Sequence, residues 1–229
     1  DGDGRLAQGS DTLLEGRAGS GMGCAGAKPG QGLQGLSVQD NAPAQRSTIE
    51  AKIVLLGDSG VGKSSLALRF CQGRFNPFHE VTIGAAFLQQ IVRLRDGSQL
   101  KLHVWDTGGQ EEEMRRLGIV VPQERFRAMT HLYYRDAAGA VIVYDCTDSC
   151  SQASVEYWVK ELQQKGPAGV CMAVAANKSD FENKAISPSA MKEYCDQNNL
   201  LFVETSAKTG ENVNQLFESL AARVAGRPR

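Results

Sequence analysis

The chain has 229 residues, with 25 Lys and Arg against 26 Asp and Glu, and a formal net charge of −1. This length predicts one domain with or without a tail. The balanced charge gives no sign of the clustered basic excess that a nucleic-acid surface needs. The longest apolar runs, such as residues 140–144, are far too short to span a bilayer. The six cysteines form no C-x-x-C pair and no metal-ligand spacing, so buried thiols are the simplest interpretation for all but Cys24.

Residues 1–47 differ in composition from the rest of the chain. Eleven of the 25 glycines lie before residue 37, which predicts a disordered, glycine-rich segment. The first methionine, Met22, precedes Gly23 and Cys24. Removal of Met22 would expose Gly23 for N-myristoylation and leave Cys24 placed for palmitoylation, although that motif prefers Ser or Thr where Ala27 stands. A flexible tail with a stray methionine is the alternative.

Residues 57–64 read Gly-Asp-Ser-Gly-Val-Gly-Lys-Ser, the G-x-x-x-x-G-K-S pattern of a phosphate-binding loop. The apolar run 52–56 before it predicts a buried strand, and residues 65–70 after it predict a helix. Backbone amides would face the β-phosphate, Lys63 would add a point charge, and Ser64 would offer a hydroxyl to Mg²⁺. The residues expected around the phosphates are Asp58, Ser59, Gly60, Val61, Gly62, Lys63, Ser64 and Ser65.

Two residues of the loop after this helix are candidates for the same site. Thr82 lies 19 residues after Lys63, where a hydroxyl on a mobile loop can close over Mg²⁺ and the γ-phosphate. Phe75 either lies edge-on against a purine base or anchors the loop.

A second motif follows a predicted hairpin of two strands, residues 87–94 and 100–105. Asp106 ends the second strand and can hold Mg²⁺ through water. Gly109 lets a backbone N–H reach the γ-phosphate, and Gln110 can orient the attacking water.

The remaining elements alternate between strand and helix. Strands are predicted at 139–146, 170–176 and 200–203, and helices around 155–162, 190–195 and 213–224. This order predicts an α/β fold of the P-loop NTPase class, with a doubly wound, mostly parallel six-stranded sheet and helices on both faces. The carboxyl ends of the strands should line the site.

The segment 177–180, Asn-Lys-Ser-Asp, identifies the base. Asp180 can accept hydrogen bonds from N1–H and the 2-amino group of guanine. Adenine has neither donor, so the site should prefer guanine over adenine by about a thousandfold. Asn177 would tie this segment to the phosphate loop, and Lys178 would lie along the base. In the segment 206–208, Ser-Ala-Lys, the Ala207 amide would meet the guanine O6, and Lys208 would pack beneath the ring.

With these motifs in this order, the chain resembles the Ras-superfamily small GTPases. The segment 81–88 and the run Tyr133-Tyr134-Arg135 resemble Rab proteins, and most of all their early-endosomal branch. The resemblance covers roughly residues 50–225. It implies a Mg²⁺-dependent switch that binds GTP and hydrolyses it slowly, with Lys63, Thr82 and Gln110 as catalytic residues and Ser64, Thr82 and Asp106 around the metal.

The resemblance also implies partners and a location. We expect an exchange factor, an activating protein and effectors in endosomal vesicle trafficking. These partners would contact two switches: the loop that carries Thr82 is the first, and the segment that positions Gln110 is the second. Phe87 and Trp105 either belong to the effector surface or pack in the core. We expect a monomer on the cytosolic face of endosomal membranes, cycling with the cytosol.

The two ends of the chain depart from the usual Rab pattern. Rab proteins usually end in prenylated cysteines, whereas no cysteine follows Cys195. With Gly23 and Cys24, this resembles plant and protist endosomal Rabs anchored by N-terminal lipids; an incomplete C-terminus is the alternative. The expected organisation is a glycine-rich segment 1–47 whose true start is Met22, a GTPase domain 48–225 and a short tail 226–229.

The second switch departs from the pattern too. Gly108 replaces the family's alanine, and about 13 residues, 112–124, interrupt the run that normally leads from glutamate directly into arginine. The insertion is either a retained intron or a real insertion that changes hydrolysis or partner choice. The alternative function is therefore a nucleotide-dependent binding module with impaired hydrolysis.

Overall fold

The computed structural model describes residues 49–78, 82, 84–108, 131–185 and 187–227. The lipidation candidates Gly23 and Cys24, the second-switch residues Gly109 and Gln110, and the insertion at 112–124 lie outside the described residues. None of the described helices is long and apolar enough to cross a membrane.

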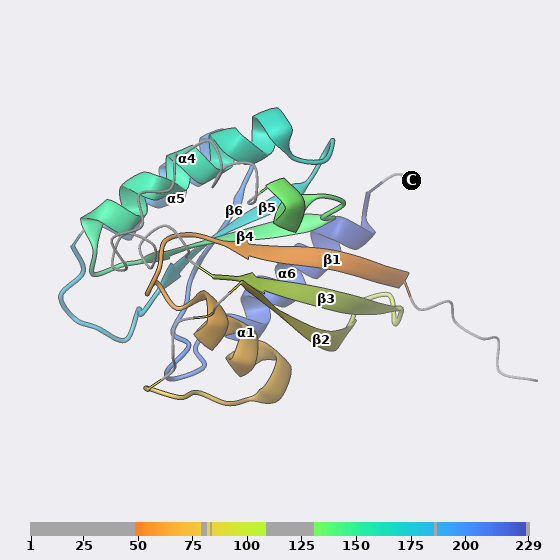
Figure 1. The fold of residues 1–229 in the computed structure, drawn as a ribbon, viewed down its shortest axis with the longest axis horizontal. Helices are drawn as coiled ribbons and strands as arrows, with labels where there is room; N and C mark the ends of the chain where they lie inside the picture. The colour runs from red at the N-terminus through yellow and green to blue at the C-terminus, as the bar shows by residue number, and fades with distance from the viewer. Residues whose placement is uncertain (1–48, 79–81, 83, 109–130, 186, 228–229) are drawn as a thin grey trace, which may run out of the picture. The chain divides into compact units, whose positions relative to one another are not determined.

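A six-stranded sheet in the order β2-β3-β1-β4-β5-β6 forms the centre of the fold (Figure 1). The strands are β1 (Ile49–Leu56), β2 (Ala85–Arg93), β3 (Gln99–Thr107), β4 (Gly139–Asp145), β5 (Cys171–Asn177) and β6 (Leu201–Glu204). Every pairing is parallel except that of β2 with β3. The predicted doubly wound, mostly parallel sheet is therefore confirmed.

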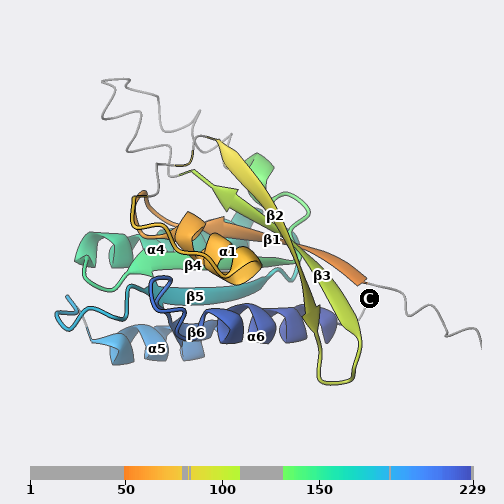
Figure 2. The same cartoon turned by 90° about the horizontal axis from the view of Figure 1, so that it is seen from below.

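Helices cover both faces of this sheet (Figure 2). They are α1 (Lys63–Gln72), α4 (Ser149–Lys165), α5 (Pro188–Gln197) and α6 (Val213–Ala225). The helices α1 and α6 share one hydrophobic core, in which the rings of Phe70 and Phe217 stack at 4.0 Å, whereas α4 and α5 enclose a second core on the other face. Central strands are accordingly buried on both faces, as in residues 53–55 of β1.

Element boundaries differ from the predicted ones by a few residues, and by more for α4. That helix begins at Ser149, six residues before the first apolar position of its predicted stripe. Asp148 caps it by accepting hydrogen bonds from the amides of Cys150 and Ser151. Cys150 is exposed at this start, so the prediction of a buried thiol is wrong there, whereas Cys146, Cys171 and Cys195 are buried.

Candidate nucleotide-binding site

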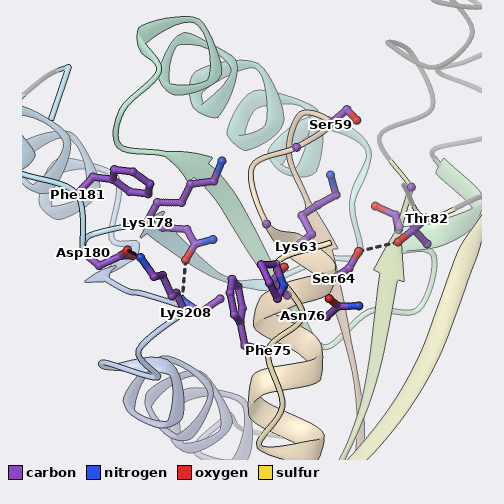
Figure 3. A pocket seen from close by; sticks show the side chains of 18 residues that line it. Ser59, Lys63, Ser64, Phe75, Asn76, Thr82, Lys178, Asp180, Phe181 and Lys208 are labelled. Carbon is purple, nitrogen blue, oxygen red and sulfur yellow. Dashed lines mark hydrogen bonds and ion pairs between the residues drawn. The ribbon is translucent and has the colours of Figure 1, made fainter. Parts of the chain in front are cut away.

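The carboxyl ends of the parallel strands meet around one cavity of about 480 Å³ (Figure 3). Most of the residues predicted from the motifs line it: Ser59, Gly60, Gly62, Lys63, Ser64, Ser65, Phe75, Thr82, Asn177, Lys178, Asp180, Ala207 and Lys208. The sequence analysis missed Asn76, Pro77, Thr107, Gly108 and Phe181, which also line it. Of the other predicted residues that the structure describes, four are not part of the lining: Asp58, Val61, Asp106 and Ser206.

Two glycines of the phosphate loop are required by the close approach of neighbouring strands. Gly57 has φ +138°, and a Cβ there would lie 2.2 Å from the carbonyl oxygen of Val143. Gly62 has φ +98°, and a Cβ there would lie 2.3 Å from Nδ2 of Asn177. Any side chain at either position would therefore push the loop away from the strands that hold it.

Lys63 is held across the mouth of the loop. Its ammonium donates to the carbonyl oxygens of Gly57 at 2.8 Å and Asp58 at 2.7 Å, and only 5% of the residue is exposed. Burial lowers the pKa of Lys63 to about 8, although the nearby charges of Asp106 and Asp58 oppose that shift. A phosphate group beside this amine would supply the negative charge that favours the ammonium form.

Three oxygen-bearing side chains meet at the start of α1. The hydroxyls of Ser64 and Thr82 lie 2.6 Å apart, and Thr82 donates to Oδ2 of Asp106 at 3.2 Å. Two hydroxyls and a carboxylate beside a phosphate loop form the hard oxygen donor set that suits Mg²⁺. The residues present therefore fit the metal that the motifs imply.

Asn177 connects the phosphate end of the site to the base end. Its Nδ2 donates to the Val61 carbonyl at 2.9 Å, and its Oδ1 accepts from the Ala207 amide at 3.2 Å. The predicted tie between the two segments is thus present. The Ala207 amide, which the sequence analysis assigned to the guanine O6, is already shared with Asn177 in this structure.

Asp180 is oriented by the base-binding segment 206–208. Its Oδ1 accepts from the Ser206 hydroxyl at 2.7 Å, and its Oδ2 lies 3.4 Å from the ammonium of Lys208. Burial opposes ionisation of Asp180, but these hydrogen bonds outweigh it and hold its pKa below the usual range. Asp180 is therefore a carboxylate at neutral pH, as recognition of two guanine donors requires.

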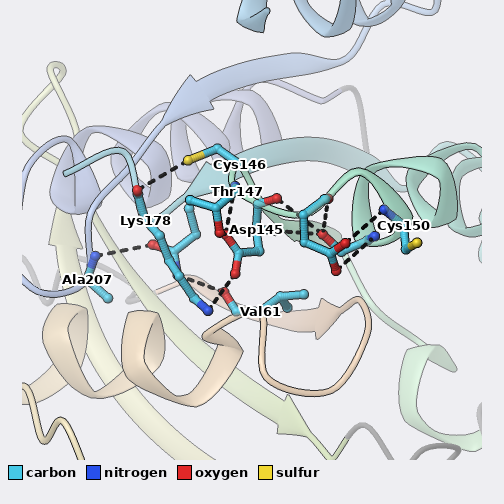
Figure 4. A network of polar contacts seen from close by, with 10 residues as sticks. Val61, Asp145, Cys146, Thr147, Cys150, Lys178 and Ala207 are labelled. Carbon is cyan, nitrogen blue, oxygen red and sulfur yellow. Dashed lines mark hydrogen bonds and ion pairs between the residues drawn. The ribbon is translucent and has the colours of Figure 1, made fainter. Parts of the chain in front are cut away.

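Sequence reasoning missed Asp145, which holds Lys178 (Figure 4). The ammonium of Lys178 lies 2.6 Å from Oδ2 of Asp145, whose Oδ1 accepts from the amide and hydroxyl of Thr147. Asp145 is the last residue of β4 and so ends a parallel strand as Asn177 does. Its position at the end of a predicted parallel strand could have identified it as a site residue.

The sequence left two roles open for Phe75 and two for the pair Phe87 and Trp105. Phe75 packs partly against the core and also lines the cavity, so the structure accommodates both roles. Phe87 is 48% exposed on edge strand β2, and its ring meets that of the half-buried Trp105 at 5.5 Å. Phe87 is thus a surface residue, whereas Trp105 also packs against the core on the α4 side.

Gly108 brings the first switch close to the end of β3. Its amide donates to the Gly84 carbonyl at 2.8 Å, and a Cβ at Gly108 would lie 2.2 Å from the Thr82 carbonyl oxygen. In this structure there is thus no room at position 108 for the side chain of the family's alanine.

Comparisons with known proteins identify the family to which the chain belongs. The Ras family model matches residues 121–226, and the model of the Roc (Ras of Complex) domain of DAPkinase matches residues 52–118. The chain is 51% identical to Ras-related protein Rab-5B of Plasmodium falciparum, over 81% of this chain and 86% of that protein.

Two further relatives agree. The chain is 43% identical to GTP-binding protein ypt5 of Schizosaccharomyces pombe, over 81% of this chain and 82% of the relative. It is 42% identical to Ras-related protein Rab5 of Nicotiana tabacum, over 80% of this chain and 85% of the relative. The chain therefore belongs to the Rab family of Ras-superfamily small GTPases, in its early-endosomal branch.

Proposed function

We propose that this protein is a guanine-nucleotide switch of endosomal vesicle trafficking that hydrolyses GTP to GDP and phosphate. One observation carries the proposal: Asn177 bonds both Val61 of the phosphate loop and Ala207 of the base-binding segment. This bridge sets Lys63 and Asp180 around a single cavity, so one ligand with a phosphate chain and a guanine base meets both.

The chemistry requires little covalent participation by the protein. Lys63 and the loop amides would hold the phosphates, and Ser64, Thr82 and Asp106 would hold Mg²⁺, Asp106 through water. When bound, Mg²⁺ neutralises the charge that develops on the phosphate oxygens. Gln110 orients the attacking water, and it lies outside the described residues.

Turnover without a partner is slow in this proposal. The described residues that line the cavity include no arginine that could act as a finger in cis, so the intrinsic rate is on the order of 10⁻⁴ s⁻¹, as for Ras. An activating protein supplies the missing charge. Slow hydrolysis suits a switch, because the γ-phosphate keeps both switch segments ordered until it is cleaved.

The partners and the membrane attachment extend the proposal. An exchange factor, an activating protein and effectors contact the switches, and Phe87 with Trp105 forms part of the effector surface. The protein acts as a monomer on the cytosolic face of endosomal membranes. An N-terminal lipid on Gly23 and Cys24 attaches it there, through a glycine-rich segment 1–47 that precedes a GTPase domain 48–225.

A second candidate is a nucleotide-dependent binding module with impaired hydrolysis. Two observations favour it: the close approach of Gly108 to Thr82, and the break between the two family matches at residues 118–121, inside the insertion 112–124. Both concern the segment that positions Gln110.

Single-turnover GTP hydrolysis separates the two candidates. The full chain is compared with a version that lacks residues 112–124, and binding of GDP and of ADP is measured in parallel. Equal hydrolysis by both chains supports an ordinary Rab switch with a tolerated loop. Hydrolysis by the shortened chain alone supports the binding module, and a failure of both chains to prefer GDP over ADP would contradict the guanine assignment.

A further inference from the structure

Arg69 lies in the last turn of α1 and donates three hydrogen bonds to backbone carbonyl oxygens. Its Nε donates to Ala207 at 2.8 Å, its Nη2 to Lys208 at 2.6 Å, and its Nη1 to Gly73 at 2.9 Å. Within the described part of the chain, Arg69 forms no ion pair with a carboxylate. Its charge is thus directed at the end of α1 and at the base-binding segment, where charge-assisted hydrogen bonds are about twice as strong as neutral ones.

The same guanidinium also contacts Phe75, on the side of the cavity where the base would bind. Its central carbon lies 5.9 Å from the centre of the Phe75 ring, which lines the cavity. A Cβ added to Gly210, which closes the turn after Lys208, would lie 3.6 Å from Cδ of Arg69. Arg69 therefore packs under both segments that would enclose the base, from a position outside the cavity lining.

Arg69 also completes a closed path of contacts between the two ends of the site. Asn177 accepts from the Ala207 amide and donates to the Val61 carbonyl of the phosphate loop. Arg69 holds the carbonyl of the same residue, Ala207, and belongs to the helix that begins at Lys63, directly after that loop. Ala207 is therefore fixed through both of its backbone polar groups, one from β5 and one from α1.

We propose that Arg69 is a positioning residue for guanine binding, which sets the base-binding segment 206–208 and Phe75 at a fixed distance from the phosphate loop. It acts through Ala207, Lys208 and Phe75, without contact of its own to the nucleotide. This inference rests on the proposed guanine-nucleotide binding. Without Arg69, the base end moves independently of the phosphate end, and the bound nucleotide escapes faster.

The chain offers a matched control in Arg223. This arginine also lies in the last turn of its helix, α6, and also donates to loop oxygens, with Nη1 bonded to the Asn199 carbonyl at 2.9 Å and Nη2 to its Oδ1 at 2.5 Å. Arg223 does not line the cavity. Both arginines are half-buried and donate to loop oxygens, Arg69 three times and Arg223 twice, but of the two only Arg69 holds the base-binding segment.

The test is the dissociation rate of GDP carrying a fluorescent methylanthraniloyl group, measured well below the melting temperatures of all variants. Arg69→Ala is expected to release this probe about tenfold faster than the unmodified chain, a change of about 1.4 kcal/mol. Arg69→Lys, which keeps the charge but has no planar fork for three separated carbonyls, should fall between them. Arg223→Ala should lower the melting temperature and leave the rate within about twofold.

A double-mutant cycle with Asn177→Ala separates positioning from general stability. Both Asn177 and Arg69 hold Ala207, so the effect of Arg69→Ala on the rate should shrink in the Asn177→Ala background, whereas that of Arg223→Ala should be unchanged. Equal rates for Arg69→Ala, Arg69→Lys and the unmodified chain, or equal acceleration by Arg69→Ala and Arg223→Ala, would overturn the proposal. If Arg69→Ala does not fold, Arg69→Lys decides by the same comparison. Failure of the unmodified chain to bind the probe would instead contradict the proposed function.

Discussion

The hydroxyl of Ser64 lies 2.6 Å from that of Thr82, although the two residues belong to different segments of the chain. Thr82 donates its hydroxyl hydrogen to Asp106, so the hydrogen between the two hydroxyls comes from Ser64. The first switch is thereby held against the start of α1 through the oxygens that would surround Mg²⁺.

Removal of the Ser64 hydroxyl should uncouple nucleotide release from the metal. In the unmodified chain, chelation of Mg²⁺ by EDTA should accelerate GDP release strongly. Ser64→Ala loses a direct ligand, a cost of about 1.5–3 kcal/mol, so release should be about 10–100-fold faster even with Mg²⁺ present. EDTA should then add little. The control is Ser189→Ala, at an exposed position of α5; an EDTA response in Ser64→Ala as large as in this control would contradict the assignment.

Replacement of Gly108 by the family's alanine should displace the first switch. The added Cβ would lie 2.2 Å from the Thr82 carbonyl, closer than any real contact, so the segment around Thr82 must move away from β3. We expect Gly108→Ala to loosen the contacts of Thr82 with Ser64 and Asp106 and to raise the GDP release rate about threefold to tenfold, which corresponds to roughly 1 kcal/mol.

The control for this change is Gly226→Ala. Neither glycine has a left-handed φ; that of Gly226 is −76°, and its added Cβ would meet only ordinary contact, 3.4 Å from the Ala222 carbonyl oxygen. Stopped-flow fluorescence of a labelled nucleotide measures both variants. An unchanged rate in Gly108→Ala would mean that the approach of Gly108 to Thr82 has no role in holding the switch.

Sequence analysis predicted the parts of the site in which the chemistry requires particular residue types at a fixed spacing along the chain. The phosphate loop needs glycines where Gly57 and Gly62 meet neighbouring strands, and Asn177 follows a recognisable apolar strand. Parallel strands then bring their carboxyl ends to one edge of the sheet. The strand order alone therefore predicts that Lys63, Asp106 and Asn177 lie close together.

Contacts between residues far apart in the sequence could not be predicted in the same way. Arg69 and Ala207 lie 138 positions apart, and their contact depends on how α1 packs against the neighbouring loop. Likewise Lys178 is paired with Asp145 because β4 and β5 are adjacent and their last residues align. The exposure of Phe87 follows from the edge position of β2, which local periodicity does not reveal.

Asp145→Asn should weaken both the fold and the base end of the site. Burial disfavours the charge of Asp145, but hydrogen bonds from Lys178 and Thr147 hold its pKa below the usual range. The asparagine leaves the Lys178 ammonium without its carboxylate, at an expected cost of about 1–3 kcal/mol in the free energy of unfolding. GDP affinity should fall about tenfold, because the stem of Lys178 loses its anchor beside the base.

The pH dependence of stability tests the Asp145 carboxylate separately. Because the pKa of Asp145 is lower in the folded state, its contribution is present above the unfolded value near 3.8 and is lost as the pH falls through the folded value. The difference in unfolding free energy between the unmodified chain and Asp145→Asn should therefore shrink below about pH 4. Urea unfolding at several pH values measures it, and a difference that stays constant down to pH 3 would exclude the ion pair as its source.

Nucleotide affinity should weaken above about pH 8 because of Lys63. Burial lowers the pKa of Lys63 to about 8 in the nucleotide-free chain, whereas a bound phosphate favours the ammonium and raises it again. Above pH 8 the amine must therefore regain a proton on binding, so the dissociation constant for GDP should rise by up to tenfold per pH unit. Titration calorimetry at pH 7 to 9.5 in buffers of different ionisation enthalpy should show that proton uptake directly.

The same shift has the opposite effect on the stability of the nucleotide-free chain. Between about pH 8 and the unfolded value near 10.5, the unfolded state binds more protons at Lys63 than the folded state does. This group alone therefore makes the fold more stable as the pH rises, by at most about 1.4 kcal/mol per pH unit. Lys63→Met removes both effects, so its unfolding free energy should lack this rise between pH 8 and 9.5. An equal rise in both chains would show that Lys63 remains charged throughout, and the buried amine would then be stabilised by the Gly57 and Asp58 carbonyls that it already contacts.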